Sequence, residues 1–331
     1  NPRTVWSVAR HSTFHSPFNG GRVRSGGPSR RDERVVNDPA EERVTTRIIR
    51  DPSDWDSIRA DWDALYADSP TASTPLDFAW LRAWWAVYQP AHRAAGLRIV
   101  TVWRSGRLVG VVPLYVRRGR GGPFGVRRLG FISTGEAVAE ETCPDRLDLL
   151  CRPGDEGRCA AAAWAAICEL EWDHLTLLDL PEGTPLWAAP GRPGDLRTLS
   201  RGSSPRADLV GGFEAYLQRL SPRTRQQVRR LLREGERAGA RLELVEPDRA
   251  SSTFDELVAL HQARWTGAGH PGVFAAPRFV DFHRRLIGRW LPGGRAVLAR
   301  LSIRPEPLAV LYGFVTGRTF DFYQSGVRLE P

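Results

Sequence analysis

The feature that most constrains this chain is a stretch of sequence that occurs twice. Leu-Val-Gly-Val-Val-Pro-Leu-Tyr at 108–115 resembles Pro-Leu-Ala-Val-Leu-Tyr-Gly-Phe at 307–314. Each stretch is predicted to be the return strand of a β-hairpin, because an apolar, β-prone run follows a short turn. Helical periodicity precedes both hairpins. The sequence therefore predicts an internal duplication of one unit, in which helices precede an antiparallel meander.

The first unit begins with two predicted amphipathic helices and continues with strands. Trp55, Trp62, Trp84 and Trp85 recur on the apolar faces of these helices, and we interpret them as core residues. Pro113 in the return strand indicates a sheet edge or a β-bulge, because proline has no N–H for the ladder. The predicted elements are helices at 53–68 and 75–88, strands at 97–103, 108–116, 127–133 and 146–151, a helix at 158–170 and a strand at 174–180.

The second unit is predicted to contain helices followed by strands. One helix begins at Ser221-Pro222, a capping box of Thr253 and Glu256 begins the next, and Pro277 begins a third. Strands are predicted at 296–303, 308–315 and 319–325. We expect a disordered basic leader at 1–45, a first domain at 46–185, a linker at 186–210 and a second domain at 211–331.

The positive charge is concentrated in two segments. Residues 1–31 contain six Arg and no acidic residue, residues 221–241 contain seven Arg and two Glu, and together they more than account for the net charge of +9. The first segment is too rich in Gly, Ser and Pro to present a fixed face, so only the second could offer the basic face that nucleic-acid binding needs. Nucleic acid is not an expected partner. All 47 cationic residues are Arg, which indicates a G+C-rich genome.

Several functional classes are disfavoured because their motifs are absent. The sequence has no GxGxxG after a strand, no Walker loop, no HExxH and no GxSxG, and none of its seven His lies at ligand spacing from another His or Cys. The four Cys are about eight residues apart and do not form the close pairs of a metal site. Because it has no apolar run of about 18 residues and no secretory signal, we expect a cytoplasmic protein with no metal and no transmembrane segment.

The order of helices and strands in both units resembles that of the GNAT acyltransferase superfamily. The resemblance is carried by an ordered series in the second unit: Ser221–Glu234, Leu257–Trp265, Gly294–Leu301, Leu308–Phe314 and Phe322–Gly326. This series looks like that of bacterial proteins associated with cellulose biosynthesis, which are similar to the Fem-type aminoacyltransferases. The resemblance covers roughly residues 50–331. It implies an α/β (α+β) fold of two tandem GNAT-like domains, each with helices packed on a mostly antiparallel mixed sheet.

The resemblance also implies where an acyl-CoA would lie. GNAT enzymes hold it between two splayed parallel strands, and a bulged strand turns a backbone N–H toward the thioester carbonyl. Residues 319–326 would be the first of these strands, which would place Tyr323, Gln324 and Ser325 beside the acyl group as candidate catalytic residues. The phosphate loop, its helix and the second strand are expected beyond Pro331, so we expect an incomplete second domain whose cofactor-binding residues are unknown. The implied co-substrate is acetyl-CoA or another acyl-CoA, without a metal.

A second place for the CoA phosphates is the loop Arg152–Gly157 of the first unit, ahead of its Ala-rich helix. Its Gly residues suit a phosphate loop. However, Asp155 and Glu156 would occupy the positive end of the helix dipole and repel pyrophosphate. We therefore expect the first domain to pack against the second and to shape the acceptor cleft.

Candidate acceptor-binding residues lie on the Arg-rich helix and on the helix that follows it. Arg225 and Arg229 are one turn apart and form a stripe that Arg223 flanks. An anionic acceptor could bind this stripe, because Arg binds phosphate in a bidentate manner; alternatively, the stripe is a solvated helix face. Trp265 could stack on a sugar or complete the core.

These observations lead to an acyl-CoA-dependent N- or O-acyltransferase that acts on a sugar or polysaccharide-related acceptor. Two alternatives stay open. The first keeps the fold but takes aminoacyl-tRNA as the donor, as Fem-type enzymes do, although no long helical hairpin is evident in the second unit. The second is a non-catalytic binding module of a polysaccharide-synthesis complex, which the acidic loop of the first unit favours.

If half of the acyl-CoA site lies beyond Pro331, residues 1–331 alone should bind acetyl-CoA more weakly than micromolar and show little activity. Without the phosphate loop and its helix, the pyrophosphate would have no N–H groups to bind. Calorimetric titration of the chain with acetyl-CoA measures this affinity. A micromolar dissociation constant would contradict the expectation.

Overall fold

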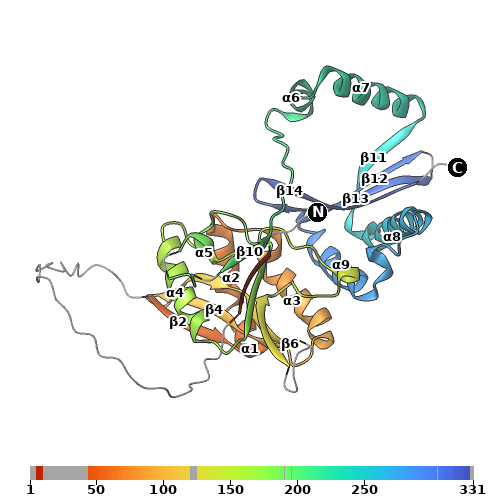
Figure 1. The fold of residues 1–331 in the computed structure, drawn as a ribbon. Helices are drawn as coiled ribbons and strands as arrows, with labels where there is room; N and C mark the ends of the chain where they lie inside the picture. The colour runs from red at the N-terminus through yellow and green to blue at the C-terminus, as the bar shows by residue number, and fades with distance from the viewer. Residues whose placement is uncertain are drawn as a thin grey trace, which may run out of the picture.

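The structure is a computed structural model of the chain. It describes residues 5–9, 44–119, 125–189, 191–194, 196–303 and 305–328. We call residues 44–200 the first half and residues 211–328 the second half. Figure 1 shows a body of sheets and helices in each, with α6 and α7 projecting from the second. No helix in these described ranges combines the length and the apolar character needed to cross a membrane.

The first half contains an antiparallel sheet with strand order β2-β4-β5-β8, which we call sheet 1. Two helices of the first half have Asp caps: the Asp51 carboxylate accepts from the Ser53 N–H at 2.8 Å, and that of Asp77 from the Ala79 N–H at 2.7 Å. The elements are β2 (Val44–Ile49), α1 (Pro52–Ser57), α2 (Arg59–Asp68), α3 (Phe78–Tyr88), β4 (Ile99–Arg104), β5 (Arg107–Val112) and β8 (Leu150–Cys151).

A six-stranded sheet, sheet 2, extends the first half in the order β10-β1-β9-β7-β6-β3. Pro113 separates β5 from β6, at the point where the chain leaves sheet 1 and enters sheet 2. Strands β7 and β9 are parallel, so this sheet is mixed. The elements are β1 (Val5–Ala9), β3 (Gly96–Leu97), β6 (Leu114–Gly119), β7 (Val126–Phe131), α4 (Glu156–Glu169), β9 (His174–Leu178), α5 (Pro185–Ala188) and β10 (Arg197–Ser200).

The second half contains an antiparallel sheet with strand order β11-β12-β13-β14, which we call sheet 3. Helix α8 packs on one face, where the buried Arg300 of β12 donates to both carboxylate oxygens of Glu256 at 2.7 and 3.2 Å. The elements are α6 (Gly212–Arg219), α7 (Pro222–Arg237), β11 (Ala240–Leu244), α8 (Ala250–Gly267), α9 (Pro277–Trp290), β12 (Ala296–Ile303), β13 (Glu306–Thr316) and β14 (Thr319–Val327).

Sheets 1 and 3 repeat the same register. In each, a helical segment follows the first strand, and a hairpin with a two-residue turn follows the helices. The return strand then has a β-bulge at its third residue, which is Val109 in β5 and Leu308 in β13. A bulge at one equivalent position in both hairpins agrees with the predicted duplication, and the predicted mixed α/β class is confirmed.

The two halves differ most at the fourth strand. In the second half this strand, β14, is continuous. In the first half it is divided into β7, which pairs with β6, and β8, which pairs with β5. Residues 132–149, which we call the inserted segment, lie between β7 and β8. By register, the inserted segment replaces Tyr323–Ser325 of β14, which are the candidate catalytic residues.

An aromatic core joins the two halves. Helices α3 and α9 pack against each other, and Trp80 of α3 is 1% exposed. Its ring centroid lies 4.9 Å from that of Phe282, 5.3 Å from that of Phe314 and 6.2 Å from that of Tyr323, all from the second half. The Trp residues predicted to be core are confirmed as buried; they are Trp55, Trp62, Trp84 and Trp85.

The two sheets are covered differently. In sheet 1, α4 packs on one face, against β2, β4 and β5. The contact is close at Gly110 of β5, where an added Cβ would lie 3.0 Å from Cys159 of α4. In sheet 3, α8 covers one face, whereas apolar side chains on the opposite face are exposed, including Leu242 (73%), Leu244 (71%) and Phe322 (60%). In the part of the chain that the structure describes, no helix occupies on sheet 3 the position that α4 has on sheet 1.

Two segments predicted without regular structure contain strands. Within the predicted leader at 1–45, β1 pairs with β9 and β10, and β2 begins at Val44; residues 1–4 and 10–43 lie outside the described residues. Within the predicted linker at 186–210, β10 pairs with β1. These short strands carry no periodicity of their own, and pairing with neighbouring strands determines their conformation.

Candidate functional site

The edge strand β14 carries a bulge. It pairs only with β13, and among the described residues no main-chain hydrogen bond reaches its outer edge. Tyr312 pairs with Gln324 and Gly313 pairs with Phe322, so Tyr323 is an extra residue in the ladder. A bulge leaves main-chain polar groups unpaired and bends the strand. A bulged edge strand therefore lies where the sequence resemblance implies one.

The side chain of Tyr323 lies in the core between the halves. Its hydroxyl donates to the Thr142 carbonyl oxygen at 2.6 Å and lies 3.1 Å from His283 Nε2. Because the Tyr323 proton is already donated, His283 must donate its Nε2–H to Tyr323. Its Nδ1 then accepts from the Tyr312 hydroxyl at 3.3 Å. Burial keeps the pKa of His283 well below its usual value and raises the pKa of both tyrosines, so this network is uncharged.

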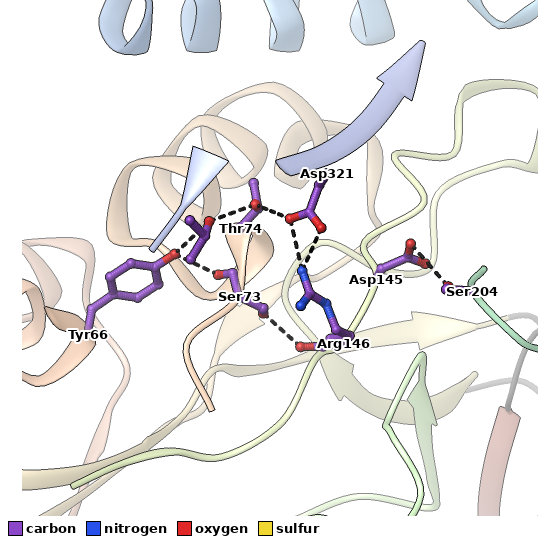
Figure 2. Close-up of polar contacts among 8 residues, drawn as sticks. Tyr66, Ser73, Thr74, Asp145, Arg146, Ser204 and Asp321 are labelled. Carbon is purple, nitrogen blue, oxygen red and sulfur yellow. Dashed lines mark hydrogen bonds and ion pairs between the residues drawn. The ribbon is translucent and has the colours of Figure 1, made fainter. Parts of the chain in front are cut away.

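Asp321, two residues before the bulge, holds β14 against the first half. Arg146 Nη2 donates to both carboxylate oxygens at 2.7 and 2.9 Å, and the Thr74 hydroxyl donates to Oδ2 at 2.8 Å (Figure 2). Arg146 belongs to the inserted segment, and Thr74 precedes α3. Contacts between a guanidinium and a carboxylate are short and directional. The first half therefore supports the part of β14 that leads to the bulge.

A row of hydroxyl groups continues from this ion pair (Figure 2). The hydroxyl of Thr74 lies 2.9 Å from that of Thr316, which lies 3.4 Å from that of Tyr66. Tyr66 donates to the Ser73 carbonyl oxygen at 3.0 Å, and the Ser73 hydroxyl donates to the Arg146 carbonyl oxygen at 2.8 Å. The row returns to Arg146, so the contact between the halves is a closed ring of polar groups.

Gln324 and Ser325 lie on opposite faces of β14. Gln324 pairs with the buried Tyr312, on the face toward α8, whereas Ser325 pairs with Leu311 on the other face. A Cβ at Gly326 would lie 2.7 Å from the main chain of α8, so a side chain would force the helix away. The structure thus brings the three predicted residues together on one strand but gives their side chains different surroundings.

The Arg-rich helix α7 lies apart from β14 (Figure 1). None of its residues is buried, and its main contact is with β11. Arg225 donates to Gln218, Arg229 forms an ion pair with Glu214 at 3.0 Å, and Arg223 is exposed. The three predicted acceptor-binding Arg therefore lie on a projecting helix and are not brought to the bulge.

Trp265, the fourth predicted acceptor-binding residue, lies near the end of α8. Its side chain is 39% exposed, and its ring centroid lies 5.8 Å from that of His261 and 5.9 Å from that of His270. A Cβ at Gly326 would lie 3.0 Å from the His261 amide nitrogen. Trp265 is therefore one helical turn beyond the contact between α8 and β14, and it is not a sealed core residue.

The acidic loop of the first half has internal partners for its charges. Asp155, before α4, is 2% exposed; it accepts from Arg104 at 2.6 Å and lies 3.6 Å from Arg158. The buried Arg152 pairs with Asp68. A phosphate at this helix end would have to displace a buried carboxylate, which agrees with the expectation that CoA does not bind there.

The first half is also closed at the position equivalent to the bulge. Asp148 lies three residues before Cys151, just as Gln324 lies three residues before Val327, which has the position in sheet 3 that Cys151 has in sheet 1. Asp148 is buried, and burial raises the pKa of its carboxyl to about 7. The adjacent Leu147 N–H donates to a carbonyl at the end of β9, at 3.1 Å. Main-chain pairing thus occupies the edge that is open in β14.

No disulfide joins the four cysteines, all of which lie in described residues. Cys151 and Cys159 are buried, and burial raises the pKa of each thiol to about 12. Among the residues that the structure describes, no group of three His, Cys, Asp or Glu side chains is arranged to hold a metal ion.

Comparison with known proteins identifies a domain in the second half. Residues 222–330 match the family model of the acetyltransferase (GNAT) domain. The chain is also similar to a crystal structure described as a conserved protein of unknown function from Bacteroides thetaiotaomicron VPI-5482, at 14% identity and a TM-score of 0.36, over 85% of this chain and 80% of that chain. No curated protein matches. The second half thus carries a GNAT-type acetyltransferase domain, which supports an acyltransferase function.

Sequence reasoning did not find the residues that hold the bulge in place. Arg146 and Asp321 are 175 positions apart, and Thr142 and Tyr323 are 181 apart. For His283 the sequence predicts a structural His on an amphipathic helix, but it does not identify Tyr312 and Tyr323 as the partners. The sequence does indicate that His283 is buried, because its spacing from Phe279, Phe282 and Leu286 places it on the apolar face of α9. A buried imidazole needs hydrogen-bond partners.

The buried His283 should make stability depend on pH. Its pKa is depressed in the folded state relative to 6.5, so the unfolded chain binds more protons below that pH and stability falls as pH drops. Replacing His283→Gln should reduce the slope of unfolding free energy against pH, between pH 6.5 and about 5, by up to about 1.4 kcal/mol per pH unit. Urea denaturation at several pH values measures this slope.

The exposed His270→Gln variant is the control for losing an imidazole. The prediction fails if the His283→Gln slope equals that of the unmodified protein, whatever its stability at neutral pH.

Proposed function

We propose that the second half is an acyl-CoA-dependent N- or O-acyltransferase in which the acyl group lies at the bulge of β14. The observation that carries this proposal is the bulge at Tyr323, on an edge strand of a GNAT-type domain. Main-chain N–H groups released there would stabilise negative charge on the thioester carbonyl oxygen. An acceptor amine or hydroxyl attacks the carbonyl carbon and loses its proton, the C–S bond breaks, and CoA leaves as the thiol.

The three residues at the bulge have different roles in this proposal. Tyr323 is a positioning residue, because its hydroxyl is held by Thr142 and His283 and is not available to substrate. Ser325, whose main-chain N–H faces the outer edge of β14 by the alternation of the ladder, contributes this N–H to the acyl carbonyl, and Gln324 lies beside the acyl group. The outer edge of β14 suits acetyl-CoA, since its unpaired main-chain groups can bond the amides of the pantetheine arm.

The first domain, at 46–185, would form one wall of the acceptor site through its inserted segment, and the linker at 186–210 leads to the second domain at 211–331. Contacts of Arg146 and Thr142 with β14 support this role. A sugar or polysaccharide-related acceptor follows from the sequence resemblance to cellulose-associated and Fem-like proteins. Such an enzyme would act in the cytoplasm of a bacterium, where acyl-CoA is available.

A second candidate keeps the fold and changes the donor to aminoacyl-tRNA. The observation in its favour is the projecting pair of α6 and α7, whose exposed Arg residues form a basic surface. The phosphate backbone of a nucleic acid would bind such a surface in a salt-dependent manner. Transfer from an aminoacyl-tRNA in place of acetyl-CoA would establish this candidate and exclude the first.

Removing one main-chain N–H tests the role of the bulge. In Ser325→Pro the N–H is lost, whereas Ser325→Ala loses only the hydroxyl group. Loss of one oxyanion donor lowers turnover by about 10²–10³-fold, so we expect this drop in kcat/KM for the proline variant and near-normal values for the alanine variant. The assay follows acetyl-CoA cleavage by thiol release and acetylated product by mass spectrometry, with glucosamine and cellobiose as amine and hydroxyl probes.

Thermal unfolding of both variants confirms that each retains its fold. Equal kcat/KM in the two variants would exclude the main-chain N–H of Ser325 from the mechanism. Absence of any acetylated product with the unmodified protein, across several acyl-CoAs, would exclude acyl transfer to these probes.

Charge reversal tests acceptor binding on α7. Because α7 lies apart from β14, the double variant Arg225→Glu/Arg229→Glu should leave KM for an anionic probe, glucosamine 6-phosphate, unchanged. The value for neutral glucosamine should not change. Arg230→Glu, which lies on the same helix outside the stripe, is the control. Unchanged KM would leave the stripe as a solvated helix face, whereas a rise of at least about tenfold would show that the stripe binds the phosphate group of the acceptor.

A further inference from the structure

A cavity of about 540 Å³ lies between the two halves. The first half contributes α2, with Tyr66, and the start of α3. The second half contributes the end of α9, the residues before β12, and the turn between β13 and β14. The hydroxyl row of Figure 2 runs along one side, since Tyr66 and Thr316 belong both to this row and to the cavity lining. Three Arg and two Asp line the cavity; they are Arg59, Arg289, Arg295, Asp63 and Asp77.

Arg295 is fixed in orientation but sparsely bonded. Its guanidinium lies 4.7 Å from the centroid of the Trp290 ring and 5.6 Å from that of the Tyr66 ring. It donates to Asp77 at 2.6 Å, and no other hydrogen bond from it is made to the residues that the structure describes. A guanidinium has several further N–H donors in a rigid fork. Arg295 is thus pre-organised to bind an additional anion.

The acidic residues of the cavity already have partners. Asp77 accepts from the N–H groups of Ala79 and Trp80 at 2.7 and 3.4 Å, so it is held by the N-terminus of α3 as well as by Arg295. Asp63 forms an i,i+4 ion pair with Arg59 at 3.6 Å. Desolvation and the nearby Asp77 raise the pKa of Asp63, which reduces its negative charge at mildly acidic pH.

The remaining cation is Arg289. It is exposed on the last turn of α9 and, among the described residues, forms no ion pair or hydrogen bond. It therefore leaves the cavity with an excess of positive charge. The start of α3, which the Asp77 carboxylate caps, also lines the cavity through Ala79.

From this arrangement we propose that the cavity binds a ligand through an anionic phosphate or carboxylate group, with Arg59, Arg289 and Arg295 as its partners. Such a group bridges the halves, because Arg59 belongs to the first half and the other two to the second. The proposal does not depend on acyl transfer, since the cavity lies at the turn that begins β14 and not at the bulge.

Binding of simple anions to the full chain tests the proposal without any acyl-CoA. Inorganic phosphate and malonate, titrated by calorimetry against a chloride reference, distinguish a phosphate from a carboxylate ligand. We expect at least one of them to bind with a dissociation constant of about 1 mM or tighter and to raise the unfolding temperature. Both Arg59→Ala and Arg289→Ala should weaken this binding at least about tenfold, since each removes a charge-assisted hydrogen bond.

The control is Arg285→Ala, one turn earlier on α9, whose guanidinium is exposed and paired with Asp281 at 3.1 Å. All three Arg residues are exposed at the surface of helices, so the variants should fold. The control should bind the anion as the unmodified protein does. The proposal is overturned if neither anion binds at about 1 mM, or if the Arg285 variant loses as much affinity as the other two.

Discussion

The hydroxyl of Tyr323 ties the edge strand of one half to the main chain of the other, and the geometry of the candidate site depends on this bond. A buried hydroxyl without a partner costs about 1–3 kcal/mol, so the Thr142 carbonyl and His283 together define one position for the Tyr323 ring. Moving β14 by one residue would transfer Tyr323 to the exposed face of sheet 3. The location of the bulge is therefore fixed by contacts with the first half as well as by the β13–β14 ladder.

The duplication explains why such contacts exist. Both halves share a register, including the hairpin bulges at Val109 and Leu308, so the fourth strands of sheets 1 and 3 are equivalent. In the second half this strand has a bulge of one residue, whereas the first half carries the inserted segment, which contacts β14 through Arg146 and Thr142. The first half also closes its own edge through Leu147 and pairs the charge of Asp155. These features favour a first half that holds β14 in place, and they disfavour a second acyl-CoA site there.

Local patterns in the sequence predicted most helices and strands, but they could not predict contacts between distant segments. Helical periodicity predicted the helices that carry the buried Trp residues, and the repeated sequence at 108–115 and 307–314 predicted both return strands. The strands β1 and β10 were missed because each is short and is stabilised by pairing across sheet 2. The ion pair of Arg146 and Asp321 was missed because no local rule relates residues so far apart. Within the site, the bulged strand was implied by resemblance, whereas its positioning network required the structure.

The uniform use of Arg is a further reason why the sequence did not identify the functional cations. In a chain whose cations are all Arg, the choice of Arg over Lys carries no information, so only position distinguishes a structural cation from one available to a ligand. Arg300 and Arg152 are buried and form ion pairs with Glu256 and Asp68, so replacing either Arg would remove a packed side chain as well as an ion pair. Arg289 and the stripe on α7 have no such burial. Salt screens exposed charges most effectively, so interactions of anions with these residues should weaken with ionic strength while the buried pairs persist.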